Sequence, residues 1–243
     1  MRKPIELYRC DNQLMNDAID RIIVEIHSHK KQEGKKSLLL SGCSSASGTT
    51  MIAIDIAIAL AMAGWKTLFV DCDFRKGTEY KRLNNIVESG LTDYLSGKTE
   101  ENKVIQETNY EKLDYIASGN GKASPTQLLC STRMESLIKT ISPEYDYIIY
   151  DFPSLNIVSD AMIFLPYMDG IMLVAALEKA TKKQLRDAKR KVEKYKENYY
   201  GLIVNQVDMP QYRNYIKDFD YFKEQNLSRL LKENLKKKKR IEK

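Results

Sequence analysis

The stretch at 36–75 constrains the fold of this chain more than any other part of the sequence. Its successive parts read as a buried strand, a small polar loop, an apolar helix, a second buried strand and an acidic loop, at 37–40, 41–47, 51–63, 67–70 and 71–75. Gly64 follows the helical pattern, as is typical of a helix C-terminus. The second strand leads into Asp71 and Asp73, and open α/β sheets bind ligands at this end of their strands.

The loop and the start of the helix form a candidate anion site, because unpaired backbone N–H groups and the helix dipole both point toward a loop in this position. The phosphate-loop pattern G-x-x-x-x-G-K-[ST] falls on Cys43, Gly48, Thr49 and Thr50. The second glycine and the final hydroxyl residue match, whereas Cys43 and Thr49 replace the first glycine and the lysine. The motif alone does not distinguish a nucleotide-binding loop from an ordinary strand–helix–strand crossover.

The surrounding segments resemble the bacterial tyrosine kinases (BY-kinases) of capsule and exopolysaccharide synthesis. Asp71, Asp73 and Arg75 match the family pattern D-x-D-x-R in full. Further segments resemble family segments in the same order, at 89–97, 117–129, 145–153 and 159–161. The resemblance covers 17–208 and implies a three-layer α/β P-loop NTPase fold, with a mostly parallel sheet and helices on both faces.

The resemblance also implies roles for individual residues. The candidate nucleotide-binding residues are Ser47, Gly48, Thr49, Thr50, Met51, Arg75 and Asn205. Arg75 would brace the acidic loop or meet a neighbouring subunit, and Asn205 would lie near adenine. The candidate catalytic residues are Asp71, Asp73 and Asp151, and the candidate Mg²⁺ ligands are Thr50, Asp71 and Asp151. The implied cofactors are ATP or ADP and Mg²⁺.

Several departures from the family pattern argue against full activity. Thr49 replaces a lysine that would contact phosphate. Losing one charge-assisted hydrogen bond of roughly 1.5–3 kcal/mol should lower the reaction rate by at least about one to two orders of magnitude. Cys43, Ser45 and Ala46 replace glycine or proline, so we expect the loop not to adopt left-handed turns. The family's C-terminal tyrosine cluster is also missing, and the last tyrosines are scattered at Tyr212, Tyr215 and Tyr221.

These observations leave three hypotheses for function. The first is an ATP-dependent tyrosine kinase that autophosphorylates and regulates capsular or exopolysaccharide biosynthesis and export. The second is a catalytically impaired relative that docks on the polysaccharide complex and regulates it. The third is an ATPase switch of the partition or septum-site type, although that group also depends on loop lysines and this loop has none.

Three parts of the chain are expected: an N-terminal segment at 1–35, a P-loop NTPase-like domain at 36–210 and a helical basic tail at 211–243. The N-terminal segment has an amphipathic helix whose apolar residues are Leu14, Met15, Ala18, Ile19, Ile22, Ile23 and Ile26. Asp17, Asp20 and Ile23 occupy the positions of a family subunit contact, E-x-x-R-x-x-R. Both arginines are replaced, so we expect the helix to pack on the sheet, with homo-oligomerisation as the alternative. His27 and His29 are expected to be solvated.

The rest of the chain alternates strands and helices, which favours a parallel sheet. The expected strands are 113–117, 145–150, 171–176 and 201–205. The expected helices are one from Ser124 and Pro125 to Ile141, a short one after Ser159, and a charged one at 181–197.

Composition and the lengths of the apolar segments indicate the class of protein and its cellular location. Hydrophobic residues make up 43% and charged residues 30%, which is typical of a soluble globular protein. The longest apolar stretch contains Asp55 and is too short to span a membrane, and no signal peptide is visible, so we expect a cytoplasmic protein. The family implies a membrane-anchored activator. The basic run Lys236–Arg240 is expected to be a solvated end, with contact to an anionic membrane as the alternative, and we expect no nucleic-acid binding.

Overall fold

The computed structural model describes residues 4–9, 12–33, 36–75, 89–120 and 124–208. Residues up to Asn205 belong to one compact unit, and a second unit begins at Gln206. The expected helical tail lies outside the described residues. Within those residues no helix has both the length and the apolar character that crossing a membrane would require.

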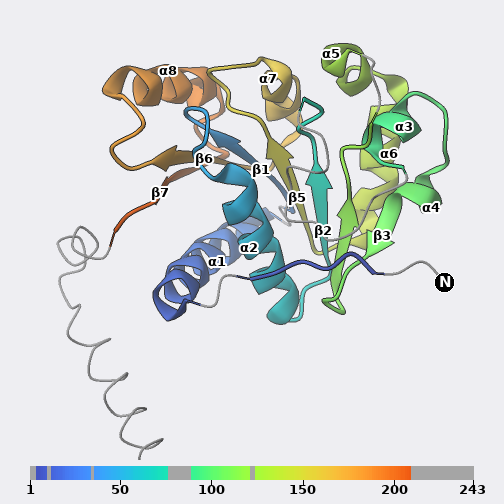
Figure 1. Cartoon of the computed structure of the whole chain (residues 1–243), viewed down its shortest axis with the longest axis horizontal. Helices are drawn as coiled ribbons and strands as arrows, with labels where there is room; N and C mark the ends of the chain where they lie inside the picture. Colours follow the sequence, from blue (N-terminus) through green and yellow to red (C-terminus); the bar gives the residue numbers. More distant parts are fainter. Residues whose placement is uncertain (1–3, 10–11, 34–35, 76–88, 121–123, 209–243) are drawn as a thin grey trace, which may run out of the picture. The chain divides into compact units, whose positions relative to one another are not determined.

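A mostly parallel sheet runs through the compact unit (Figure 1). Its described strands are β1 (Ser37–Gly42), β2 (Thr67–Asp71), β3 (Ile105–Glu107), β4 (Leu113–Ile116), β5 (Tyr147–Phe152), β6 (Gly170–Ala176) and β7 (Tyr199–Asn205). Their spatial order is β3-β4-β2-β5-β1-β6-β7. Each neighbouring pair is parallel except β3 and β4, which are antiparallel. The strand β3 is absent from the sequence prediction, and the parallel α/β class is confirmed.

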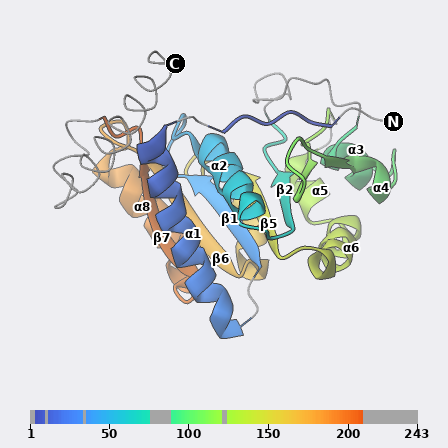
Figure 2. The same ribbon diagram turned by 90° about the horizontal axis from the view of Figure 1, so that it is seen from below.

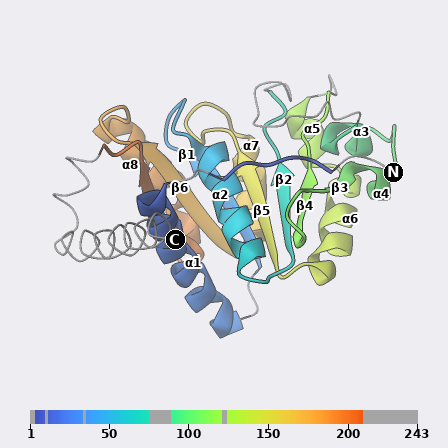
Figure 3. The same cartoon turned by 60° about the horizontal axis from the view of Figure 1, so that its bottom comes forward.

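Helices connect the strands and cover the sheet. They are α1 (Gln13–Glu33), α2 (Thr49–Met62), α3 (Leu91–Leu95), α4 (Glu101–Val104), α5 (Pro125–Leu129), α6 (Thr132–Ile141), α7 (Asp160–Phe164) and α8 (Lys182–Val192). Figures 2 and 3 show α1 and α2 lying together across one face of the strands. The charged helix expected at 181–197 is shorter, because a 3₁₀ turn at Glu193–Tyr195 follows α8.

Alternating residues of the strands build two separate cores, one on each face of the sheet. Leu38 and Leu40 of β1 pack with α1 and α2, whereas Leu39 between them packs in the cluster that includes α6, α7 and α8. Side chains alternate between the faces of a strand, so a strand covered on both faces must be apolar at every position. The unbroken apolar runs of the central strands follow from this burial.

Two local expectations are wrong, one about a long helix and one about the histidines of α1. The helix expected from Ser124 to Ile141 breaks at Cys130, and a second helix, α6, begins after Ser131, whose Oγ accepts a hydrogen bond from the Met134 amide at 3.3 Å. A serine in the middle of a helical pattern can therefore cap a new helix.

The histidines of α1 are not simply solvated. His27 stacks on Trp65 with ring centroids 5.0 Å apart, and His29 stacks on Tyr200 at 4.0 Å. Both rings therefore attach α1 to the rest of the unit. This contact agrees with the expectation that the N-terminal helix packs on the sheet.

The arrangement of the strands brings their carboxyl ends to one edge of the sheet. Asp71 at the end of β2 pairs in register with Asp151 in β5, and β1 lies on the other side of β5. The loop after β1 leads directly into α2 at the same edge. The candidate site residues from distant parts of the sequence therefore meet here.

Candidate nucleotide site

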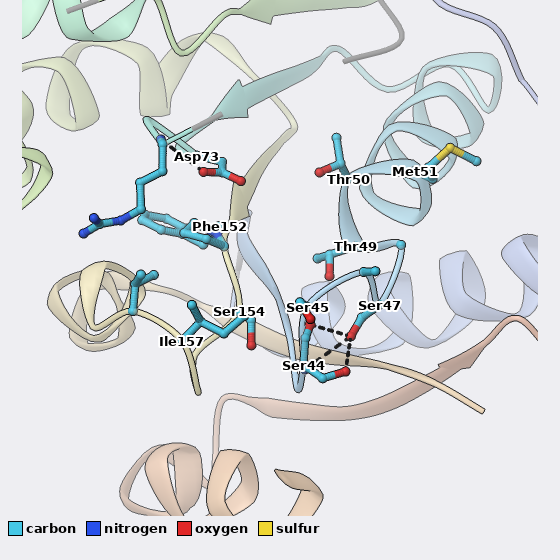
Figure 4. A pocket seen from close by; sticks show the side chains of 15 residues that line it. Ser44, Ser45, Ser47, Thr49, Thr50, Met51, Asp73, Phe152, Ser154 and Ile157 are labelled. Atoms are coloured by element: carbon cyan, nitrogen blue, oxygen red, sulfur yellow. Dashed lines mark hydrogen bonds between the residues drawn. The ribbon is translucent and has the colours of Figure 1, made fainter. Parts of the chain in front are cut away.

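A cavity of about 390 Å³ opens at this edge of the sheet. The loop at 44–48 and the first turn of α2 form one wall, Asp73 and Arg75 a second, and the segments at 152–154 and 157–158 a third. Figure 4 shows the hydroxyl of Thr50 and the carboxylate of Asp73 facing each other across this space.

The loop does adopt left-handed turns, contrary to the expectation from its sequence. Ala46 has a φ of 55° and Gly48, the N-cap residue of α2, has a φ of 77°. No side chain caps this helix start. The first N–H groups of a helix have no intrahelical acceptor, so those of the first turn of α2 are available to a ligand in the cavity.

Side chains hold the loop in this shape. Ser47 Oγ donates to the Ser44 carbonyl at 2.8 Å and accepts from the Ser44 amide at 3.3 Å (Figure 4). Asn205 Nδ2 donates to the Ser47 carbonyl at 2.9 Å, and Asn156 Nδ2 donates to the Cys43 carbonyl at 2.8 Å. These donors compensate the negative ends of three loop carbonyls, which favours an anion nearby.

The left-handed Ala46 gives a test of this loop conformation. A non-glycine residue in this region is destabilised by roughly 1–2 kcal/mol, and glycine loses part of that gain through its more flexible unfolded state. Ala46→Gly should therefore raise the free energy of unfolding by about 0.5–1 kcal/mol, measured by urea denaturation. Ala63→Gly is the control, because Ala63 has a φ of −75° and should show no gain. Equal effects of the two changes would contradict the left-handed loop.

Cys43 replaces the first glycine of the pattern and lies fully buried beneath the loop. Its amide donates to the Val174 carbonyl at 2.8 Å, which ties the start of the loop to β6. Burial raises the pKa of the Cys43 thiol to about 11, so the side chain stays protonated near neutral pH. Cys43 is therefore a packing residue and not a nucleophile.

Two of the candidate carboxylates lie beneath the cavity and do not line it. Asp71 and Asp151 are 0% and 1% exposed. Asp71 Oδ1 accepts a hydrogen bond from the Asp73 amide at 3.0 Å. The hydroxyl of the buried Tyr115 also bonds to Asp71, and burial together with both carboxylates raises the pKa of Tyr115 well above its ordinary value. Asp71 thus orients the acidic loop from below.

Asp73 and Arg75 reach the cavity itself. Arg75 donates through Nε and Nη2 to the two carboxylate oxygens of Asp160, at 3.0 and 3.2 Å. This fork, partly offset by burial, raises the pKa of the Arg75 guanidinium. The backbone amide of Arg75 also donates a hydrogen bond to Asp73 Oδ1 at 3.2 Å. Arg75 therefore links the acidic loop to α7, which begins at Asp160.

The structure thus brings most of the candidate residues together. Those that line the cavity are Ser47, Gly48, Thr49, Thr50, Met51, Asp73 and Arg75. Those that support it from outside its lining are Asp71, Asp151 and Asn205. Sequence reasoning missed Asp160 and Asn156 as partners of the site. The family-like segment at 159–161 was a signal for the first, and no sequence signal pointed to the second.

The residues at the cavity suit a hard cation bound together with phosphate. Thr50 and Asp73 offer oxygen ligands, which Mg²⁺ prefers. Within the described residues no three His, Cys, Asp or Glu side chains group as a protein-only metal site. Mg²⁺ at nucleotide sites normally uses one or two protein ligands with water and phosphate oxygens, so the arrangement fits this mode.

Comparison with known proteins agrees with this geometry. The family model described as an AAA domain matches residues 44–209. The tyrosine-protein kinase CpsD of Streptococcus pneumoniae is 33% identical over 177 residues, which cover 72% of this chain and 77% of CpsD. The chain belongs to the bacterial tyrosine-kinase family of P-loop NTPases.

Other members of the bacterial tyrosine-kinase family differ in length. A candidate tyrosine-protein kinase in a cps region of Klebsiella pneumoniae is 31% identical over 79% of this chain, which spans only 26% of that protein. The solved kinase domain of Escherichia coli ETK superposes with a TM-score of 0.72 at 28% identity, covering 80% of this chain and 78% of that domain. Membership in this family of P-loop NTPases implies nucleotide binding.

Proposed function

We propose that this chain is an ATP-dependent protein-tyrosine kinase that regulates capsular or exopolysaccharide biosynthesis. The observation that carries the proposal is the cavity in which the first turn of α2 faces the carboxylate of Asp73. Donors for a phosphate and an acceptor for a hydroxyl proton are needed together in phosphoryl transfer. The relatives described above, which are named tyrosine-protein kinases and one of which lies in a cps region, support the same activity and setting.

In this proposal the first-turn amides of α2 and the Thr50 hydroxyl hold the phosphates. Thr50, which lines the cavity, would hold Mg²⁺ directly, and Asp71 and Asp151, which lie beneath the cavity, would hold it through water. A bound Mg²⁺ would neutralise charge on the phosphates. Asp73 accepts the proton of a tyrosine hydroxyl as its oxygen forms a bond to the γ-phosphorus. The bond from that phosphorus to the bridging oxygen breaks, and ADP leaves.

The partners of the proposed kinase follow from the family resemblance. We assign it a membrane-anchored polysaccharide co-polymerase as activator and a cytoplasmic location near the inner face of the membrane. The domain at 36–210 would carry out phosphoryl transfer. The basic tail at 211–243 would contact the anionic surface of the membrane through Lys236–Arg240. Self-association through α1 is a further proposal, although Asp20 and Ile23 stand where the family has arginines.

One observation favours a second candidate function. The loop lacks a lysine, because Thr49 stands in its place, and a chain of this kind without activity would act by docking on the polysaccharide complex.

A phosphorylation experiment separates the two candidates. The purified chain is incubated with ATP and Mg²⁺, and phosphotyrosine is followed by mass spectrometry. The kinase proposal expects phosphotyrosine that grows with time and requires ATP. If ATP binds but phosphotyrosine never forms, the docking function is the better account.

A further inference from the structure

A strongly basic helix, α8, lies on the surface of the compact unit. Six of its eleven residues are lysine or arginine and one, Asp187, is acidic, so the helix alone carries a net charge of +5, compared with +6 for the whole chain. Within the residues that the structure describes, no ion pair involves a residue of α8. The described part of the protein therefore leaves the positive charge of this helix without a neutralising partner.

The packing of α8 turns most of its cations to one side. Ala188 and Val192 are buried in the core. At about 100° per residue, the exposed cations of the helix fall within an arc of about 120° that points away from these buried residues, and no carboxylate falls within it. We call this arc the basic face of α8, and its members are Lys182, Lys183, Arg186, Lys189 and Arg190.

Hydrogen bonds also hold α8 in place. Asn156 Nδ2 donates to the Gln184 carbonyl in α8 at 2.7 Å and to the Cys43 carbonyl in the phosphate loop at 2.8 Å. Lys191 Nζ donates to the Leu155 carbonyl at 2.5 Å. Because the helix is attached both by its apolar side and by these bonds, the basic face is a fixed feature of the surface.

An exposed apolar side chain lies beside the basic face. Ile157 is 60% exposed and lines a cavity of about 530 Å³ together with Lys183 and Arg190. Among the described residues, none of the side chains that line this cavity is aromatic, whereas single-stranded nucleic acids stack their bases on aromatic side chains. A bilayer accepts apolar side chains between its headgroups, and a phosphate backbone does not. The surface therefore suits an anionic bilayer better than a nucleic acid.

We propose that the basic face of α8 is a docking surface for a bilayer that contains anionic phospholipids. Clusters of about four to eight lysines and arginines on an amphipathic helix are typical of such surfaces, and each one strengthens binding by about fivefold. Ser44, Ser45 and Ile157 line both the cavity beside α8 and the nucleotide cavity, so a docked bilayer would lie next to the nucleotide site. The inference rests on the membrane setting of the proposed function and does not require kinase activity.

Binding to vesicles tests this surface. The full chain is sedimented with vesicles of equal parts phosphatidylglycerol and phosphatidylcholine, without nucleotide, at about 0.15 M salt. The combined changes Lys182→Gln, Arg186→Gln and Lys189→Gln should weaken binding by about tenfold to a hundredfold, because three cations are lost. Vesicles of phosphatidylcholine alone should show no such difference, and about 1 M salt should remove it.

The combined changes Lys98→Gln, Lys103→Gln and Lys139→Gln are the matched control. These lysines are exposed and lie on or next to α3, α4 and α6, which Figures 1 and 2 show on the other side of the unit from α8. The control removes the same charge from the chain and should leave vesicle binding within about threefold of the unmodified chain. A further variant with Lys236–Arg240 changed to Gln separates α8 from the tail, and the α8 changes should still weaken binding in that background.

Several results would overturn this inference. The unmodified chain does not bind the anionic vesicles, or the α8 variant binds them as well as the control variant does. In a third, the chain binds duplex DNA more tightly than the vesicles and the α8 changes remove that binding, which makes the surface a nucleic-acid site. Each of these results leaves the kinase proposal standing, because phosphotyrosine formation is measured without vesicles.

Discussion

Thr49→Lys should strengthen the binding of ATP by about ten- to a hundredfold, because it adds a charge-assisted hydrogen bond worth roughly 1.5–3 kcal/mol. Thr49 begins α2 and lines the nucleotide cavity, so a longer side chain here starts at the wall that faces the phosphates. The measurement is calorimetric titration with ATP and Mg²⁺ at fixed salt.

Thr49→Gln is the matched control, since it has comparable length without the charge. If Thr49→Lys and Thr49→Gln bind ATP equally, the loop does not present its first turn to phosphate.

Asp73→Asn should lower the rate of tyrosine phosphorylation by about 10²–10⁴-fold, the usual contribution of a positioned general base. The amide keeps the size of the carboxylate and can still accept the hydrogen bond that Asp73 Oδ1 accepts from the Arg75 amide. The acidic loop should therefore keep its shape, and ATP affinity should change by only a few-fold. The measurement is the initial rate of phosphotyrosine formation at saturating ATP.

Asp146→Asn provides the matched control for Asp73→Asn. Asp146 is also a carboxylate that accepts a backbone hydrogen bond, from the Lys66 amide at 2.9 Å, but it precedes β5 at the opposite end of the strands. Its replacement should leave the phosphorylation rate unchanged. An Asp73→Asn variant that phosphorylates as fast as this control would remove Asp73 from the mechanism.

The sequence predicted the elements of the fold because their burial imposes patterns that a single chain displays. Two cores enclose the sheet, and they require the unbroken apolar runs of β1, β2 and β5 and the apolar helix α2. The short antiparallel β3 gave no such pattern, since its residues are half-buried or exposed. The break at Ser131 was missed because a capping serine and a helical serine look alike in sequence.

The candidate site was predictable only where a residue type carries its own chemistry. Asp73 and Thr50 face the cavity, but the backbone of Ala46 was misjudged, because tertiary hydrogen bonds to the loop outweigh the preference of alanine for right-handed conformations. The approach of α8 to the loop depends on Asn156, whose bridging contacts join segments far apart in sequence. No local pattern records a contact of this kind.

The central claim is that the loop binds nucleotide despite the loss of its lysine, and direct titration of the unmodified chain tests it. We expect saturable binding of ATP with Mg²⁺ at a single site, displaced by ADP. The contradicting result would be an unmodified chain that binds neither nucleotide while Thr49→Lys binds ATP. That outcome would make the loop a disabled relic and move the function of the chain to its protein partners.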